Sequence, residues 1–248
     1  MHKKEKIVVL VHILKTGGST LRSIIKKQYQ PEEIAILDFL DKPAIKSEFE
    51  RRLNHHNIKC VLGHFDFGIH RFSEKQCSYI TLLRDPVERV ISDYYFIRRS
   101  KEHPLYSKVI KMNIEQFVNC EEIQWQISNL QTRVISGSTS RDLMLAQKNL
   151  KEHFSIAGIT EMFNESLFLM SKQFNWNIQD FKRINVTENR PKRENISAHI
   201  IKQIEDKNKF DIELYNFAKR SLNEKIEQLG PLEKKELEKF LIRCQTRG

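Results

Sequence analysis

Cysteine and long apolar runs are both scarce in this 248-residue chain. The four cysteines, Cys60, Cys77, Cys120 and Cys244, are far apart, and none forms a C-x-x-C pair. This distribution argues against a disulfide framework or a zinc site and fits a reducing compartment. The apolar run Ile7–Val11 near the N-terminus is too short for a signal-peptide core or a membrane span. We therefore expect a cytoplasmic protein with no transmembrane segment and no metal.

Two glycine-rich nucleotide-binding patterns are also missing. In a Walker A loop, G-x-x-x-x-G-K-[ST], the lysine follows the glycines, whereas here Lys15 precedes Gly17 and Gly18. The Rossmann pattern G-x-G-x-x-G does not occur, and neither does a zinc finger, an RNA-recognition motif or a basic zipper. These absences disfavour a P-loop nucleotide kinase, and they disfavour nucleic acid as the main partner.

Positive charge is in excess, with 42 Lys and Arg against 32 Asp and Glu, giving a net charge of +10. The basic residues are spread along the chain, and their excess favours an anionic partner such as an acidic glycan or a nucleotide. The length suits one α/β domain, or one with a small helical annex. Since no repeat, low-complexity tract or clear linker is present, we expect a single domain over residues 1–248.

The chain is organised around residues 6–21, KIVVLVHILKTGGSTL. The apolar run predicts a buried parallel strand, and the polar, glycine-rich stretch after it leads into a helix. Such a turn aims backbone N–H groups at an anion, glycine lets the backbone approach closely, and lysine and hydroxyl groups add donors. An ordinary capped helix is the alternative. The residues expected to bind phosphate here are Lys15, Thr16, Gly17, Gly18, Ser19 and Thr20.

Two further apolar strands end in polar groups: Ile58–Gly63 leads into His64, and Ser78–Leu83 leads into Arg84. Strands followed by polar turns and helices indicate a parallel sheet, whose ligands bind beyond the carboxyl ends of the strands. We therefore expect an α/β fold, a central parallel sheet flanked by helices, with Lys15, His64 and Arg84 on one rim. Other expected elements are strands at Ile34–Phe39 and Phe154–Ile159 and helices at 19–28, from Pro86, at 160–174 and over 197–246.

Arg84 and Ser92 form a second candidate phosphate site. Arg84 stands at a strand end, and Ser92 follows about two turns into the next helix, which begins with the N-cap Asp85 and Pro86. A phosphate beside that helix could contact both side chains. The alternative is structural, with Arg84 paired to Asp85 or Glu88 and Ser92 solvated.

Two phosphate sites on one rim suggest a nucleotide phosphorylated at two places. HILKTGGSTL and LLRDPVERVISDYY resemble the two phosphate motifs of the PAPS-dependent sulfotransferases, most closely the carbohydrate branch with the heparan sulfate 2-O- and 6-O-sulfotransferases. Gly63-His64, GITEMFNESL at 158–167 and NVTENRP at 185–191 resemble other segments of that family. Leu14 departs from it, since Pro or Gln is more familiar there, and we expect Leu14 to point away from the ligand.

The resemblance implies a sulfotransferase (P-loop-like) fold and sulfuryl transfer from PAPS (3′-phosphoadenosine 5′-phosphosulfate) to a hydroxyl, with PAP (adenosine 3′,5′-bisphosphate) as product. Lys15 to Thr20 would hold the 5′-phosphosulfate, and Arg84 with Ser92 the 3′-phosphate. The chemistry needs a cation at the leaving oxygen, which suits Lys15, and a base at the acceptor hydroxyl, which suits His64. His12 is expected to pack beneath the loop.

Basic and aromatic side chains near the rim predict a glycan or glycolipid acceptor. The residues expected to bind the acceptor are His70, Arg71, Trp125 and Arg133, while Arg98, Arg99 and Lys101 are either part of this surface or merely solvated. Two other functions stay open. One is a P-loop-type nucleotide kinase, which shares the sheet topology, and the other is a non-catalytic nucleotide- or glycan-binding module.

Overall fold

The computed structural model describes residues 6–37, 50–178, 181–182, 184, 191 and 193–245. Within them, five parallel strands form one sheet in the order β2-β3-β1-β4-β5. The α/β fold with a central parallel sheet is therefore confirmed. The strands are β1 (Lys6–Val11), β2 (Ile34–Ile36), β3 (Cys60–Gly63), β4 (Gln76–Leu83) and β5 (Phe154–Ile159).

The central position of β1 follows from its sequence. Ile7–Val11 is buried throughout, which suits a strand that is covered on both faces and paired on both sides. It pairs with β3 from Val8 to Val11 and with β4 from Lys6 to Val11. The chain turns to opposite sides of β1 for these two neighbours, so the loops after β1, β3 and β4 meet at a topological switch point, where ligands of such sheets bind.

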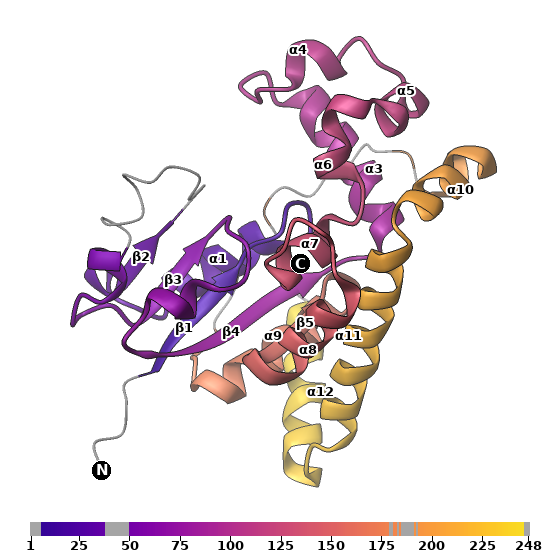
Figure 1. Cartoon of the computed structure of the whole chain (residues 1–248). Coiled ribbons are helices and arrows are strands. Elements are labelled where there is room, and N and C mark those ends of the chain that lie inside the picture. The colour runs from indigo at the N-terminus through magenta and orange to yellow at the C-terminus, as the bar shows by residue number, and fades with distance from the viewer. Residues whose placement is uncertain are drawn as a thin grey trace.

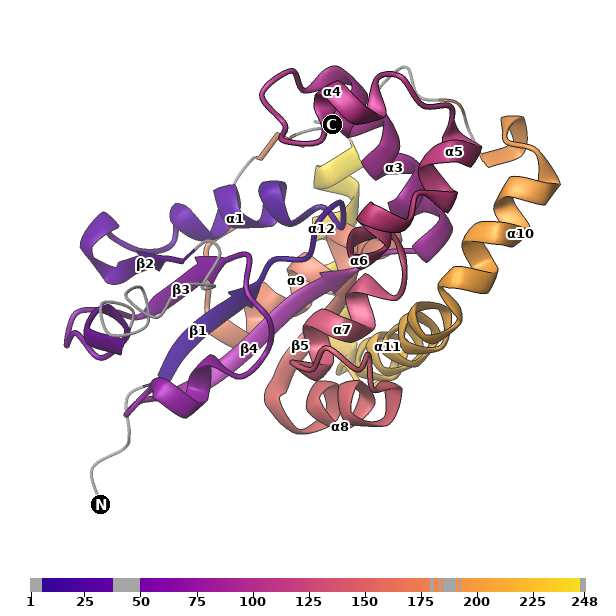
Figure 2. The ribbon, with the colours of Figure 1, turned by 45° about the horizontal axis from the view of Figure 1, so that its top comes forward.

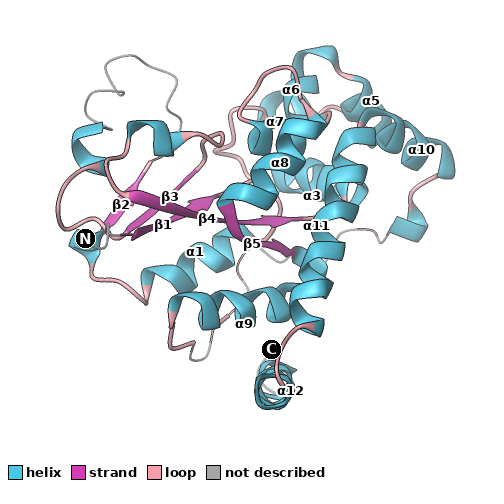
Figure 3. Cartoon of the chain, turned by 60° about the horizontal axis from the view of Figure 1, so that its bottom comes forward, coloured by secondary structure: helices cyan, strands magenta, loops and turns pink. Residues whose placement is uncertain are grey.

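Helices cover both faces of the sheet (Figures 1 and 3). Helices α1 and α9 lie on one face, with α12 packed against α9, while α7 and α8 lie on the other. Helix α11 closes the edge at β5, as Figure 2 shows from another side. These helices are α1 (Gly18–Lys26), α7 (Leu130–Ser136), α8 (Leu143–His153), α9 (Phe163–Phe174), α11 (Lys209–Glu227) and α12 (Pro231–Gln245).

A second, smaller hydrophobic cluster lies beyond the carboxyl ends of the strands, at the top of Figure 1. It is built by one side of α3 (Pro86–Arg99) with α4 (Tyr106–Val109), α5 (Ile114–Asn119), α6 (Gln124–Ile127) and α10 (Ala198–Lys207). Helix α3 begins as expected, with Asp85 as N-cap accepting from the Glu88 N–H at 2.9 Å. This cluster has the character of a helical annex to the sheet. No helix in the described part of the chain is both long and apolar enough to cross a bilayer.

The element boundaries differ from expectation mainly on the β2 side. Strand β2 ends at Ile36, and Asp38 and Phe39 lie outside the described residues. Strand β3 begins at Cys60 rather than Ile58, because the Ile58 N–H closes a turn onto the His55 carbonyl at 3.0 Å. Strand β5 and helix α9 match the expected ranges closely.

The turn after β1 is closed by contact between a glycine and a histidine. His12 is buried directly after the strand, and a Cβ atom on Gly18 would overlap its imidazole ring. The ring also stacks against His64, with centroids 4.1 Å apart. Gly18 is therefore required by packing, and His12 packs beneath the loop as expected.

We expect Gly18→Ala to destabilise the fold by about 1–3 kcal/mol, because the added methyl group overlaps the His12 ring, which is buried and stacked on His64. Urea unfolding followed by circular dichroism measures this. Gly230→Ala is the matched control: its nearest atom would be Glu233 Oε2 at 3.7 Å, so it should stay within about 0.5 kcal/mol of wild type. Equal stability of the two variants would contradict the packing role of Gly18.

Candidate active site

The loop between β1 and α1 has the backbone of an anion-binding turn. Lys15 and Gly17 both have positive φ, 67° and 84°, and Gly17 is the N-cap of the nine-residue α1. The first helical N–H groups of α1 therefore open toward the strand ends. Thr16 is buried and its Oγ1 donates to the Ile13 carbonyl at 3.0 Å, so this hydroxyl closes the loop upon itself. Ser19 is half-buried on the first turn of α1.

The Thr20 hydroxyl is hydrogen-bonded to another segment of the chain. Its Oγ1 accepts from the Ile184 N–H at 2.8 Å and donates to the Ile184 carbonyl at 3.4 Å. The hydroxyl therefore fixes the start of the segment that resembles a family motif, whose residues 185–190 lie outside the described part of the chain. A phosphate contact through Thr20 stays a prediction.

Two hydroxyl side chains of the segment 158–167 form hydrogen bonds that hold the loop after β1 and helix α9 in place. Thr160 Oγ1 contacts two carbonyls, that of Thr16 at 2.6 Å and that of Leu83 at 3.0 Å, and so ties the β1 loop to the end of β4. Ser166 Oγ accepts from the Ile159 N–H at 2.9 Å and holds α9 against β5. These bonds explain why a Thr and a Ser stand at those positions of the segment.

Lys15 lies on an aromatic side chain. Its Nζ is 3.5 Å from the centroid of the Phe96 ring, which belongs to α3. Burial lowers the pKa of Lys15 to about 8, with Asp93 opposing this shift and Arg99 and Arg84 adding to it. The cation is thus partly desolvated beside the loop, where an anionic group would bind it more strongly than in water.

Arg84, at the end of β4, is hydrogen-bonded to the loop after β1. Its Nη1 donates to the Lys15 carbonyl at 3.0 Å, and its side chain is 17% exposed. Nη2 lies 3.6 Å from Glu88 Oε2, and Nε lies 4.0 Å from Glu161 Oε1. The ion pair with Glu88 considered as the structural alternative is therefore present. Ser92 is buried two turns further along α3.

His64 follows β3 and faces the first loop. Its Nδ1 lies 2.8 Å from the His12 carbonyl. Because a carbonyl only accepts, Nδ1 carries the proton and Nε2 carries the lone pair in the neutral ring. Burial, with further contributions from His64, Arg22 and Lys15, lowers the pKa of His12 to about 3, so His12 is a neutral packing partner.

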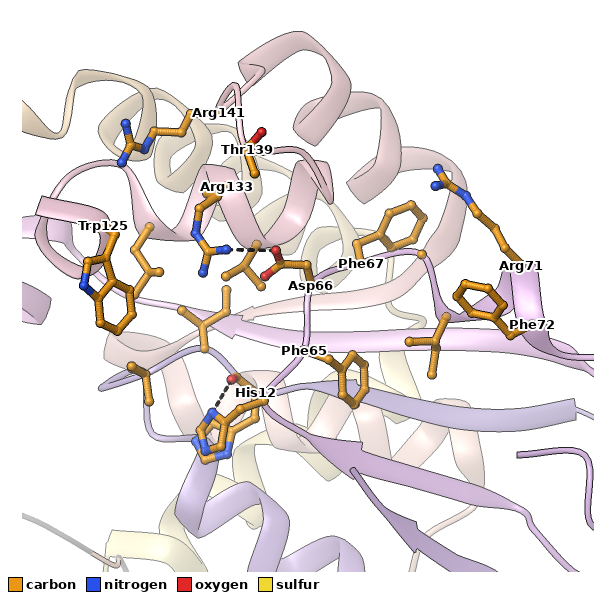
Figure 4. A pocket seen from close by; sticks show the side chains of 17 residues that line it. His12, Phe65, Asp66, Phe67, Arg71, Phe72, Trp125, Arg133, Thr139 and Arg141 are labelled. Carbon is orange, nitrogen blue, oxygen red and sulfur yellow. Dashed lines mark hydrogen bonds and ion pairs between the residues drawn. The ribbon is translucent and has the colours of Figure 1, made fainter. Parts of the chain in front are cut away.

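A pocket of about 660 Å³ opens beside His64 (Figure 4). Its walls come from the ends of β1 and β3, from α6 and α7, and from the turn before α8. It contains three of the four residues expected to bind the acceptor, with the Trp125 side chain 51% exposed. It also contains residues that the sequence analysis did not single out for this role. The lining includes His12, Leu14, His64, Asp66, Arg71, Trp125, Arg133, Thr139 and Arg141.

The two walls of this pocket are joined by polar contacts. Arg133 Nη1 donates to Asp66 Oδ2 at 2.8 Å, and the Phe67 N–H donates to the Val134 carbonyl at 2.8 Å. Asp66 was missed because a lone aspartate after a histidine has no motif of its own. Leu14 also lines this pocket, and its expected orientation away from the ligand stays a prediction.

His70, which was expected to bind the acceptor, does not line this pocket. Its Nδ1 lies 2.9 Å from the Tyr79 hydroxyl, and its ring stacks on His153 with centroids 5.1 Å apart. It lines a separate pocket of about 410 Å³ near the beginning of β4 and β5. The 3₁₀ turn Ile69–Phe72 carries the chain back toward the start of β4, away from the rim.

Among the other basic residues considered, Arg98 has a structural role. Its Nη1 donates to the carbonyls of Ile110 and Met112 at 3.0 and 2.9 Å. These bonds give the backbone carbonyls after α4 a hydrogen-bond donor. Arg99 lies near the same Phe96 ring as Lys15, with its guanidinium carbon 5.7 Å from the centroid. Lys101 is exposed.

Comparison with known proteins identifies relatives of this chain. Human heparan-sulfate 6-O-sulfotransferase 2 is 29% identical over 178 residues, covering 57% of this chain and 29% of that protein. The fruit-fly uronyl 2-sulfotransferase homolog pip is 29% identical over 126 residues, covering 49% of this chain and 22% of that protein. The chain thus spans under a third of the length of these relatives. The solved structure of mouse sulfotransferase SULT7A1 complexed with PAP aligns with a TM-score of 0.47 and 16% identity over 71% of this chain and 61% of that chain.

The family profile described as galactose-3-O-sulfotransferase matches residues 4–245. This match includes all five strands, the loop after β1 and the Arg84–Ser92 helix. It confirms the expected resemblance to carbohydrate sulfotransferases, and the chain belongs to the galactose-3-O-sulfotransferase family.

Proposed function

We propose that this protein transfers a sulfuryl group from PAPS to a hydroxyl of a carbohydrate acceptor. The observation that carries the proposal is the meeting of three motifs at one switch point: the loop with Lys15 after β1, His64 after β3 and Arg84 after β4. Arg84 contacts the Lys15 carbonyl, and a pocket opens beside His64. The family of the chain supports this reaction class over a P-loop kinase.

The 5′-phosphosulfate would occupy the loop at the N-terminus of α1, where backbone N–H groups and the Lys15 ammonium are available. The 3′-phosphate would lie beside α3, contacting Arg84 and Ser92. In the structure Glu88 lies 3.6 Å from Arg84, farther than the Lys15 carbonyl at 3.0 Å, and a phosphate with bidentate geometry would replace Glu88. Both assignments rest on placement along the rim.

In the transfer step, the acceptor oxygen attacks sulfur while the bond from sulfur to the bridging phosphate oxygen breaks. His64 Nε2 takes the hydroxyl proton, since Nδ1 is held protonated by the His12 carbonyl. Lys15 and the loop N–H groups stabilise the charge on the leaving phosphate oxygen. The products are the sulfate ester and PAP, with the proton left on His64.

The acceptor would lie in the pocket beside His64. Trp125 offers an aromatic face, and Arg71, Arg133 and Arg141 offer donors for sugar hydroxyl or acidic groups. A glycan or glycolipid fits this lining. Cytoplasmic location and independence of metal stay predictions from the sequence.

A non-catalytic binding module is the remaining alternative. Calorimetry with PAP and with ADP separates the nucleotide classes, because only PAP carries a 3′-phosphate for Arg84. Turnover, followed as PAP release from PAPS in the presence of acceptor, then separates an enzyme from a binding module.

For the 3′-phosphate, we expect Arg84→Ala to weaken PAP binding by roughly 2–4 kcal/mol, the scale of charge-assisted contacts in a partly desolvated site, and Ser92→Ala by about 1 kcal/mol. Isothermal calorimetry measures both. Arg220→Ala on the exposed side of α11 removes the same charge and should leave PAP affinity unchanged. Equal affinities for wild type and Arg84→Ala would remove the assignment.

For the base, we expect His64→Ala to lower kcat by about 10²–10⁴-fold with PAP affinity retained, since its partner is the acceptor. In wild type, kcat should fall at acid pH as the ring protonates, and this acid limb should be absent in the variant. His70→Ala is the control and should keep turnover, because His70 lies in the other pocket. A folded His64→Ala protein with near wild-type kcat would refute the assignment.

For the leaving group, we expect Lys15→Ala to lower turnover by at least about 10²-fold and PAP affinity more modestly, because the missing cation matters most when charge develops. Lys26→Ala, on the exposed last turn of α1, should behave as wild type. Turnover of Lys15→Ala within a few-fold of wild type would reduce Lys15 to a binding residue.

A further inference from the structure

The Lys15 ammonium is in contact with an aromatic ring. The Phe96 ring lies directly against Nζ, with 3.5 Å from Nζ to the centroid. Arg99 approaches the same ring at 5.7 Å, and the His103 ring meets it edge-on at 6.0 Å and 87°. Phe96 lies one helical turn after Ser92 and is half-buried. Phe96 therefore connects Lys15 of the first proposed phosphate site with the helix that carries Ser92 of the second.

The charges that face Lys15 come from every element around it. On α3, Asp93 favours the ammonium and Arg99 opposes it; at the end of β4, Arg84 also opposes it. His12 before the loop and His103 after α3 have lowered pKa values, in each case mainly through burial and partly through Lys15. Asp93 thus stabilises the Lys15 ammonium, whereas burial and two arginines destabilise it. A further group that stabilises the cation therefore has a clear function.

We propose that Phe96 is a positioning residue for Lys15: its ring holds the ammonium beside the phosphate-binding loop and favours the protonated form in this partly buried position. The proposal rests on the proposed function for the role of Lys15 in transfer. The interaction itself exists in the free protein and is measurable there.

An aromatic partner suits this task better than a carboxylate. A cation over a π face is stabilised by about 0.5–2 kcal/mol without a hydrogen bond, so the three N–H groups stay able to turn toward a phosphate oxygen. A carboxylate in the same place would hold the ammonium by directed bonds and would repel the anionic nucleotide. Asp93 is buried, and its Oδ2 accepts a hydrogen bond from Gln126 Nε2 at 2.6 Å, so this oxygen already has a partner within the protein.

The proposal predicts opposite effects of two substitutions on the same helix. Phe96→Leu removes the π face and should move the titration midpoint of Lys15 down by roughly one pH unit, while Phe96→Tyr should keep it. Arg99→Gln removes a repelling charge from an exposed position and should move the midpoint up. Lysine-selective NMR of the free protein, with Lys15 assigned by the Lys15→Ala variant, measures all three midpoints.

The functional consequence is a pH-dependent loss of nucleotide binding. Since the pKa of Lys15 is about 8 in wild type, the ammonium is lost as the pH rises through that value. Phe96→Leu should therefore bind PAP a few-fold more weakly than wild type near pH 8.5 and about equally near pH 6.5. The same difference should appear in kcat/KM for PAPS, which reports the free enzyme.

Unchanged Lys15 midpoints in Phe96→Leu, or equal shifts in Phe96→Leu and Phe96→Tyr, would overturn the proposal. A PAP affinity loss equal at both pH values would indicate general packing and would also overturn it. If no acceptor supports turnover while the midpoints move as expected, the proposed function fails and the role of Phe96 stands.

Discussion

Arg89 is fully buried, and its guanidinium lies where two buried carboxylates, Asp93 and Asp211, act on it. Burial lowers the pKa of the arginine and raises the pKa of both aspartates, while their mutual attraction opposes each shift. Removing either carboxylate leaves the buried arginine charge less compensated, which lowers the free energy of unfolding. Because Arg89 and Asp93 are on α3 and Asp211 is on α11, this attraction acts between the two helices, and Arg89 Nη2 also donates to the Ile127 carbonyl at 2.8 Å.

The same buried charges reach the candidate active site by hydrogen bonds. The Asp211 carboxylate accepts from the N–H groups of Gln131 and Thr132 at 3.0 and 2.7 Å, which caps the N-terminus of α7. The Gln131 side chain then binds both the N–H and the carbonyl of Arg84, each at 2.9 Å. Asp93 accepts from Gln126 on α6, next to Trp125 at the pocket. The position of Arg84 and one wall of the pocket therefore depend on buried charges that contact no proposed ligand.

The rim of the sheet was predictable because its signals are local. An apolar run followed by glycine, lysine and hydroxyl groups defines a strand, a turn and a helix start without knowledge of the rest of the chain. The adjacency of β1, β3 and β4 then follows from the general behaviour of parallel sheets. The buried charges around Arg89 were not predictable in this way, because Asp211 is over 100 residues from Arg89 and Asp93 in sequence and an arginine on a helix is normally solvated.

The sequence by itself determined the parallel α/β sheet, the turn after β1 and the place of Lys15, His64 and Arg84 at strand ends, since each depends on hydrophobic periodicity and short-range backbone chemistry. Tertiary structure decided which neighbours these residues have. It placed Phe96 under Lys15, the His12 carbonyl on His64 Nδ1, and Asp66 with Arg133 across the pocket, and it carried His70 to a different pocket. These contacts join segments far apart in the chain, so they arise only when the sheet and the helices beyond its rim pack together.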